Sequence, residues 1–248
     1  MNAPPPTGAA TFAAAQSGWM PGPSRPHLAP TALHVWRADL TVVAGDVARW
    51  LSDEEAERAT RIAGDRERRR WMQSRGVLRA LLGRYLGKDP MAVELAVGRS
   101  GKPELAGTGE RRHDLLFNLS HSQHIALYAF TLLSPVGVDV QVARDARTAA
   151  GTDRTAVARR AFGAAAARRL QGLEPAARER EFLRLWTRHE AELKRRGTGM
   201  SAAAPGARAG AIAHAAPWLV ELDVGTQAAA AVACERRADE LRLWAWRS

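Results

Sequence analysis

Two acidic residues at positions where the hydrophobic pattern expects buried side chains constrain this chain more than any other feature. Asp139 lies in the valine-rich segment 136–141, and Glu190 lies among tryptophan and leucine in segment 186–194. A carboxylate stays ionised in an apolar setting only when a cation or strong hydrogen-bond donors surround it. Two such carboxylates on different elements therefore predict a fold that brings them together around one divalent metal ion.

The alternation of residues in segment 136–141 predicts a β-strand. Its three valines fall on one face, and Gly137, Asp139 and Gln141 fall on the other, because strand side chains alternate with a period of two. Segment 124–130 is also strand-like and a short turn follows it, which predicts an antiparallel pair. Taken alone, Asp139 also fits a strand end or a turn.

A long helix is predicted from about Pro175, a favourable first-turn residue, to Gly197, a favourable C-terminal cap. Glu190 falls inside the arc of apolar side chains when residues are spaced at about 100° around the helix axis. Lys194 follows one turn later, at the margin of that arc. The alternative is a surface ion pair between Glu190 and Lys194, worth about 0.3–0.5 kcal/mol.

Periodicity and breaker residues predict further elements along the chain. Ser52 and Glu55 form a capping-box pattern at the start of one helix, and Asp65 is expected to cap the next. The predicted elements are helices at 52–62, 65–87, 153–162 and 164–171, and strands at 93–97, 115–120, 219–224, 228–234 and 241–246, with the last three strands closing the second half.

Three groups of polar residues are candidates for binding phosphate, and each has an ordinary alternative. The helix at 65–87 carries arginines on its polar face, which are typical of a solvated surface. The turn at 98–103 exposes backbone N–H groups beside basic residues, which is equally expected of a hairpin loop. A serine and a histidine stand where the strand at 115–120 ends, and such a histidine is often structural. The residues are Arg68, Arg75, Arg79, Arg99, Ser100, Lys102, Ser120 and His121.

Composition limits the class of protein. Residues 1–30 hold seven of the thirteen prolines, which predicts a disordered Pro/Ala-rich leader, and segment 198–217 is expected to be a loop. The single cysteine, Cys234, excludes a disulfide framework. No secretory signal and no apolar run of the ~18 residues that a membrane span needs are present, so we expect a cytoplasmic protein without a membrane partner.

The formal charge of +10 comes almost entirely from arginine, because only three of the 36 basic residues are lysines. A genome-level codon bias toward arginine is one explanation, and an acidic partner is the other. A nucleic-acid partner is not expected, because no platform of interleaved aromatic and basic residues is present. Phosphate-binding glycine loops and nucleophile elbows are absent, and Leu193 replaces the second histidine of a zincin helix that starts at His189.

Six motifs, in this order and spacing, resemble the Sfp-type 4′-phosphopantetheinyl transferases. The resemblance runs from about residue 33 to the C-terminus, and its most specific parts are F-N-L-S-H-S, G-V-D and W-T-x-x-E-A-x-x-K. The motifs lie at 51–55, 69–79, 101–103, 117–122, 136–141 and 182–194, the last followed by R-G-T-G at 196–199.

The resemblance implies an α+β fold built as a pseudo-twofold duplication of two similar halves, residues 31–134 and 135–248, with the cofactor site at their interface. It implies an Mg²⁺-dependent enzyme, of the holo-[acyl-carrier-protein] synthase type. This enzyme transfers the phosphopantetheine arm of coenzyme A to a serine of an acyl or peptidyl carrier protein. Such carriers are usually acidic, which suits the +10 charge. Two halves within one chain favour a monomer.

The resemblance also implies a role for each candidate residue. Asp139 and Glu190 would be metal ligands with Gln141 as a third, and Glu190 or a water on the metal would help to deprotonate the acceptor serine. Lys194 would neutralise charge on the pyrophosphate. The residues implied to hold coenzyme A phosphates are Arg75, Lys102, Ser120, His121 and Lys194, with Arg79 as a further candidate.

Two positions depart from the family pattern. Gln141 stands where a second acid is usual, and an amide carbonyl is a weaker Mg²⁺ ligand than a carboxylate. His189 stands where lysine is usual, and it is only partly cationic near neutral pH. These changes leave open an alternative: a degenerate homologue that binds coenzyme A or a carrier protein with weak or no transfer.

Overall fold

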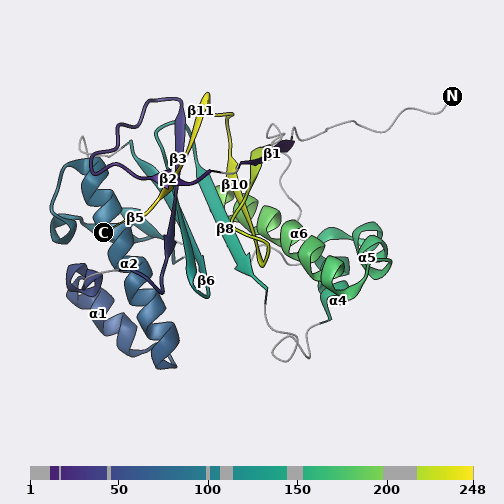
Figure 1. Cartoon of the computed structure of the whole chain (residues 1–248). Coiled ribbons are helices and arrows are strands. Elements are labelled where there is room, and N and C mark those ends of the chain that lie inside the picture. Colours follow the sequence, from purple (N-terminus) through teal and green to yellow (C-terminus); the bar gives the residue numbers. More distant parts are fainter. Residues whose placement is uncertain are drawn as a thin grey trace.

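Two β-sheets face each other between two long helices in the computed structural model of this chain (Figure 1). The structure describes residues 12–16, 18–43, 46–98, 101–106, 114–143, 153–197 and 217–247. Helix α2 covers the outer face of the first sheet and helix α6 covers the outer face of the second (Figure 1). The predicted α+β class with two halves is thus confirmed.

The first sheet has the strand order β2-β11-β3-β7-β6, and the second has the order β1-β9-β10-β8. A separate hairpin joins β4 to β5. The strands are β1 (Phe12–Gln16), β2 (Met20–Pro21), β3 (Ala32–Asp39), β4 (Leu95–Val97), β5 (Pro103–Leu105), β6 (Leu116–Ser122), β7 (Ile125–Thr131), β8 (Val136–Val142), β9 (Trp218–Leu222), β10 (Ala228–Cys234) and β11 (Glu240–Ala245).

Seven helical elements connect these strands within the described ranges. They are η1 (Val47–Trp50), α1 (Asp53–Thr60), α2 (Asp65–Leu86), η2 (Pro90–Ala92), α4 (Arg154–Phe162), α5 (Ala164–Gln171) and α6 (Pro175–Arg196). The capping box of Ser52 and Glu55 forms as predicted, and α6 ends at Gly197 in the left-handed conformation. Asp65 is instead the first helical residue of α2, because Gly64 occupies the cap position. None of the helices described is long and apolar enough to cross a membrane.

The valines of β8 pack between the two sheets, against side chains of β3 and β7. The opposite face of β8 meets α6, and Gly137 makes that approach possible. A Cβ added at Gly137 would lie 2.0 Å from the backbone oxygen of Ala191 and 2.4 Å from the nitrogen of Arg195. The backbone of α6 therefore rests directly on β8, which places Asp139 and Glu190 on facing elements.

The predicted antiparallel pairing of 124–130 with 136–141 is wrong. Strand β7 pairs with β3 and β6 in the first sheet, whereas β8 pairs with β10 in the second. The chain crosses from one sheet to the other at the turn between them. Strands β7 and β8 each pair with a strand that is distant in the sequence, and local turn signals do not predict such pairs.

The edges of the two sheets meet at β6 and β8, and side chains rather than backbone pairs join them. Asn118 Oδ1 accepts a hydrogen bond from the Val138 N–H at 2.9 Å, and Ser122 Oγ accepts one from the Val142 N–H at 3.0 Å. Between them, Ser120 Oγ accepts from the Val140 N–H at 3.4 Å. Polar residues at every second position of β6 thus satisfy the free edge of β8.

The two ends of the chain exchange sheets. Strand β1 pairs with β9 in the second sheet, whereas β11 pairs in parallel with β3 in the first sheet. The prediction that the last strand closes the second half is therefore wrong for β11. Strands β1 and β2 also fall inside the segment 1–30 that was expected to be disordered, because backbone pairing with β9 and β11 holds them. The domain boundary at residues 134 and 135 stays a prediction.

Candidate functional site

Asp139 is the centre of a buried polar cluster on β8. Its side chain is only 2% exposed, and it accepts hydrogen bonds from three side chains. Ser120 Oγ and Lys194 Nζ each donate to Asp139 Oδ1 at 2.7 Å. The amide nitrogen of Gln141 donates to Oδ2 at 3.2 Å. Donors from β6, β8 and α6 therefore satisfy this carboxylate, as its burial requires.

Glu190 is the second buried carboxylate, 9% exposed on the face of α6 that meets the sheet. Within the described ranges, no side chain donates a hydrogen bond to it or forms an ion pair with it. Burial, followed by the negative charge of Asp139, raises the pKa of Glu190, while Lys194 and Lys102 act in the opposite direction. A buried carboxylate without donors beside another carboxylate is a site where a cation would lower the free energy.

Two lysines stand beside the carboxylates. Besides its ion pair with Asp139, Lys194 donates to the backbone oxygen of Val138 at 3.1 Å. Lys102, from the turn between β4 and β5, donates to the backbone oxygen of Lys194. Burial, followed by the charge of Lys194, lowers the pKa of Lys102 to about 8. Both predicted lysines therefore converge on the two carboxylates from separate elements.

The donor set fits a hard divalent cation that is completed by ligands from a substrate. Within the ranges described, no group of three or more histidine, cysteine, aspartate or glutamate side chains is arranged to hold a metal. Asp139 and Glu190 offer two carboxylates, and Gln141 lies beside Asp139. Mg²⁺ is commonly held by one or two carboxylates together with substrate phosphates and water. The observation that supports this fit is that Glu190, whose pKa is raised, has no hydrogen-bond donor or ion-pair partner among the described side chains.

A group of cations surrounds His121 at the end of β6. Partial burial of the ring, followed by the positive charges of Lys194, Arg70 and Arg75, lowers the pKa of His121. Part of the residue remains exposed. Arg75 is buried, and its Nη1 atom lacks a hydrogen-bond partner among the described residues. Its Nε atom lies 3.2 Å from Glu55. A cluster of this charge with an unused donor suits an anion.

Two predicted phosphate ligands have other partners in the structure. Arg79 is 3% exposed and donates to Glu55, to Pro90 O at 3.2 Å and to Val93 O at 2.9 Å. It therefore ties α2 to α1 and to the segment after η2, and neither the solvated nor the phosphate-binding alternative describes it. Ser120 directs its hydroxyl at Asp139. Arg99 and Ser100 lie outside the described residues.

Sequence reasoning missed Arg70 and the polar series on β6. Arg70 stands one turn before Ser74 on α2 and contributes charge at His121, but nothing in its helical spacing separates it from neighbouring arginines. The series Asn118, Ser120 and Ser122 did carry a signal, since polar residues at a period of two mark one face of a strand.

Two family profiles match the chain in tandem. The profile described as "4'-phosphopantetheinyl transferase, N-terminal" matches residues 36–131. The profile described as "4'-phosphopantetheinyl transferase superfamily" matches residues 135–235. The two matches meet at the turn between β7 and β8, where the chain passes from the first sheet to the second.

Three curated proteins are similar to the chain. The 4'-phosphopantetheinyl transferase HetI of Nostoc sp. is 35% identical over 189 residues, which are 75% of this chain and 77% of that protein. A putative 4'-phosphopantetheinyl transferase of Synechocystis sp. is 32% identical over 151 residues, or 61% and 58% of the two chains. The 4'-phosphopantetheinyl transferase of Bacillus subtilis is 26% identical over 166 residues, or 66% and 69%.

Proposed function

Because the chain belongs to the 4′-phosphopantetheinyl transferase superfamily, we propose that it transfers the phosphopantetheine arm of coenzyme A to a serine of an acyl or peptidyl carrier protein. One observation of the site carries the proposal. Two buried carboxylates, Asp139 on β8 and Glu190 on α6, are close enough for their charges to interact, and Lys194 pairs with the first and offsets the charge of the second. This arrangement supplies both signs of charge that phosphoryl-type transfer needs.

The carboxylates of Asp139 and Glu190 would hold Mg²⁺, with Gln141 as a third contact. Mg²⁺ supplies charge neutralisation at the pyrophosphate and holds it in position. Glu190, or a water on the metal, would then accept the proton of the carrier serine, since no side chain of the described ranges already donates a hydrogen bond to this carboxylate. The serine oxygen forms a bond to the phosphorus of the phosphopantetheine arm, while the bond from that phosphorus to the leaving nucleotide breaks.

Basic residues on three sides support binding of coenzyme A phosphates. Lys194 lies beside Asp139 and would offset negative charge that grows on the pyrophosphate. Lys102 is close enough to contribute charge at Glu190. His121 and the unused donor of Arg75 would contact further phosphate oxygens. The net charge of +10 favours an acidic carrier protein as the acceptor.

The direct test incubates the protein with coenzyme A, Mg²⁺ and an apo carrier protein and weighs the carrier by mass spectrometry. We expect the mass of one phosphopantetheine arm to be added. Asp139→Ala and Glu190→Ala should each slow transfer on the order of 10²-fold or more, because each removes charge from the reacting site. Glu174→Ala, an exposed change at the other end of α6, is the matched control and should leave the rate unchanged.

Full activity in either site variant would rule out the shared metal site. Circular dichroism must show that each variant folds, because Asp139→Ala leaves the partly buried Lys194 without its ion pair.

Two contacts favour a second candidate, a homologue that binds coenzyme A or a carrier protein but transfers it poorly. The amide nitrogen of Gln141 faces Asp139, so its carbonyl points away from that carboxylate. Burial, followed by the charge of Arg196, lowers the pKa of His189, and its ring packs against Phe162. His189 therefore carries less positive charge near neutral pH than an exposed histidine does. Coenzyme A binding by calorimetry without any gain of carrier mass would select this candidate.

A further inference from the structure

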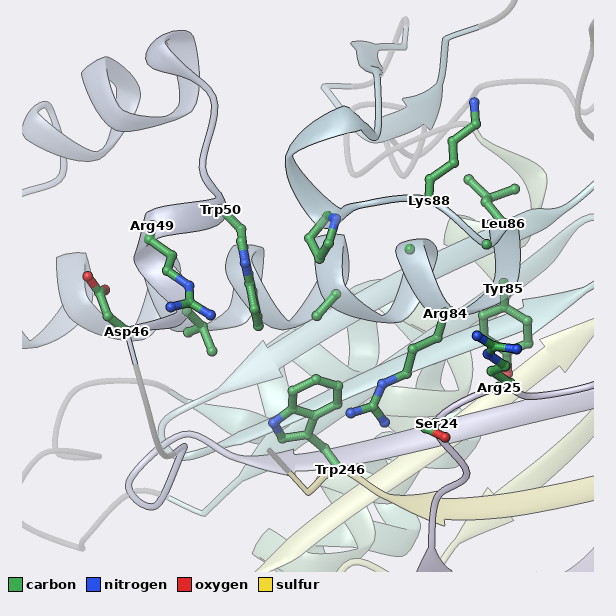
Figure 2. A pocket seen from close by; sticks show the side chains of 15 residues that line it. Ser24, Arg25, Asp46, Arg49, Trp50, Arg84, Tyr85, Leu86, Lys88 and Trp246 are labelled. Carbon is green, nitrogen blue, oxygen red and sulfur yellow. The ribbon is translucent and has the colours of Figure 1, made fainter.

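A hollow of about 940 Å³ lies beside the C-terminal half of α2, between η1 and the last residues of the chain (Figure 2). None of the residues that the proposed phosphopantetheine transfer uses lies in the lining of this hollow. The candidate site lies where β8 meets α6, on the second sheet. The hollow is lined by residues of α2, and α2 covers the outer face of the first sheet (Figure 1). The hollow is thus a separate feature that the proposed function does not use.

Backbone contacts shape the walls of this hollow. A Cβ added at Gly76 would lie 2.2 Å from the backbone oxygen of Val47, and one at Gly83 would lie 2.7 Å from that of Lys88. Helix η1 and the segment after α2 therefore rest on α2 two turns apart. Ala80 and Gly83 form part of the lining, and the methyl group of Ala80 and the bare backbone of Gly83 leave the space open.

Two stacked pairs of arginine and tryptophan stand in the lining. The guanidinium of Arg49 lies 5.2 Å from the centre of the Trp50 ring, and that of Arg84 lies 4.2 Å from the centre of the Trp246 ring. Figure 2 shows the first pair on the η1 side and the second on the side of α2 and the C-terminal segment. Arg84 donates from its two terminal nitrogens to Pro23 O at 3.4 Å and Arg247 O at 3.1 Å, whereas the side chain of Arg49 donates to no group of the described ranges. A guanidinium stacked on an indole still directs N–H donors sideways, so Arg49 keeps its donors for an anion.

The lining carries more positive than negative side chains. Arg25, Arg49, Arg84 and Lys88 line the hollow, and Asp46 is the one acidic residue among the fifteen described lining residues. No carboxylate of the described ranges forms an ion pair with any of the four cations, although many arginines elsewhere are paired. The indole N–H of Trp246 also lacks a partner among the described residues.

We propose that this hollow binds a small anionic ligand that carries a planar ring, with a nucleoside monophosphate as the simplest cellular representative. The guanidinium groups of Arg25 and Arg49, which have no partner within the described ranges, can bind phosphate oxygens, and the indole faces offer stacking surface for a ring. The volume lies within the range of small-molecule sites, about 300–1,000 Å³. Neither the phosphate nor the ring alone uses both features of the lining.

The test titrates the full chain with guanosine monophosphate, guanosine and inorganic phosphate, and follows tryptophan fluorescence and heat. We expect the nucleotide to bind at least about tenfold more tightly than guanosine or phosphate, because it alone makes both the charged hydrogen bonds and the stacking contacts. Hydrogen exchange should slow at residues 46–50 and 83–88 when the nucleotide is added.

Variants then locate the binding. Arg49→Glu should weaken nucleotide binding at least about tenfold, while the exposed Arg237→Glu, with the same change in charge, should leave it unchanged. Carrier modification should proceed at the normal rate in Arg49→Glu, so failure of this proposal is distinct from failure of the transfer proposal.

Three results would overturn the inference. Nucleotide affinity could survive Arg49→Glu with no exchange protection at 46–50. It could instead be lost in His121→Ala, which would place the nucleotide at the transfer site. Phosphate could bind as tightly as the nucleotide, which would mean an adventitious ion only.

Discussion

Gln141 is the residue at which a single substitution most directly tests the metal site. Its amide nitrogen donates to Asp139 at 3.2 Å, so position 141 lies within reach of any ion held there. Gln141→Glu replaces a neutral group with a carboxylate, which is a stronger ligand for Mg²⁺. We expect the concentration of Mg²⁺ for half-maximal transfer to fall about tenfold, equivalent to about 1.4 kcal/mol.

The variant Gln141→Ala is the matched control, because it removes the amide without adding charge. It should leave the Mg²⁺ requirement unchanged or raise it. An identical Mg²⁺ titration for Gln141→Glu and the parent protein would show that position 141 does not contact the metal.

His34 should make the stability of the fold depend on pH. The residue is 3% exposed, and its Nδ1 lies 2.8 Å from the hydroxyl of Tyr85, which itself accepts a hydrogen bond from the Trp36 indole. The hydroxyl hydrogen of Tyr85 is then available for donation to an unprotonated Nδ1 of His34. Burial lowers the pKa of His34 from 6.5 to about 4, and the charges of Glu240, Arg242 and His27 act on it as well.

The sign follows from the direction of this shift. A histidine whose pKa is lower in the folded state contributes its full stability above the unfolded pKa. That stability is lost as the pH falls toward the folded value. The free energy of unfolding from urea titrations should therefore decline by up to roughly 3 kcal/mol between about pH 6.5 and 4. His34→Gln should reduce this slope, and an unchanged slope would contradict the assignment.

The burial of a side chain is predicted correctly where the local hydrophobic pattern determines it. It is predicted incorrectly where a partner that is distant in the sequence determines it. Asp139 and Glu190 interrupt apolar runs, so periodicity alone places them inside. Arg75 and Arg79 sit on a helix face that the same rule assigns to solvent. Their burial depends on Glu55, which pairs with both of them from another helix. Helical spacing carries no information about such a partner.

Among the elements, the contact between β8 and α6 has the least tolerance for change. Gly137→Ala would put a methyl group 2.0 Å from the backbone of α6, so the helix must move. We expect a loss of about 2–4 kcal/mol in the free energy of unfolding. Transfer should also become slower, because Lys194 and Glu190 move with the helix.

Gly172→Ala provides the control at the element scale. A Cβ there meets its nearest neighbour at 3.7 Å, and the residue already has right-handed helical angles. Its stability should match or slightly exceed that of the parent protein. A Gly137→Ala variant with unchanged melting temperature and rate would disprove the close packing of α6 on β8.

The junction of β6 and β8 depends on side-chain acceptors. Ser122→Ala removes the acceptor of the Val142 N–H and should cost about 1 kcal/mol of stability. Ser122→Thr keeps the hydroxyl oxygen and should retain most of that energy. Urea unfolding of the two variants measures the difference, and equal stability would mean that water replaces the serine at this edge.

The sequence predicts the type and the ends of the helices and strands more accurately than it predicts which strands pair. Proline and glycine mark the ends of α6, and the helix in the structure runs between them. The pairing of β7 was mistaken because a short turn between two strands usually makes a hairpin. Here that turn instead carries the chain between sheets, and only the choice of long-range partners reveals it.

At the scale of the molecule, the resemblance implies two similar α+β halves, and the structure has two sheets that are each covered by a long helix. The predicted boundary separates residues 31–134 from 135–248, but β11 from the second segment lies inside the first sheet. No local rule anticipates such an exchange, because strands as short as β1 and β2 take their place from the strands that they pair with.

Strand β11 also determines when the first sheet can be completed during synthesis of the chain. Strand β11 lies between β2 and β3, so the first sheet lacks an internal member until residues 240–245 have left the ribosome. A nascent chain that already contains β3, β6 and β7 presents the bonding edge of β3 unpaired throughout translation of the second half. A product that stopped about a dozen residues early would keep Asp139, Glu190 and Lys194 and still lack an internal strand of the first sheet.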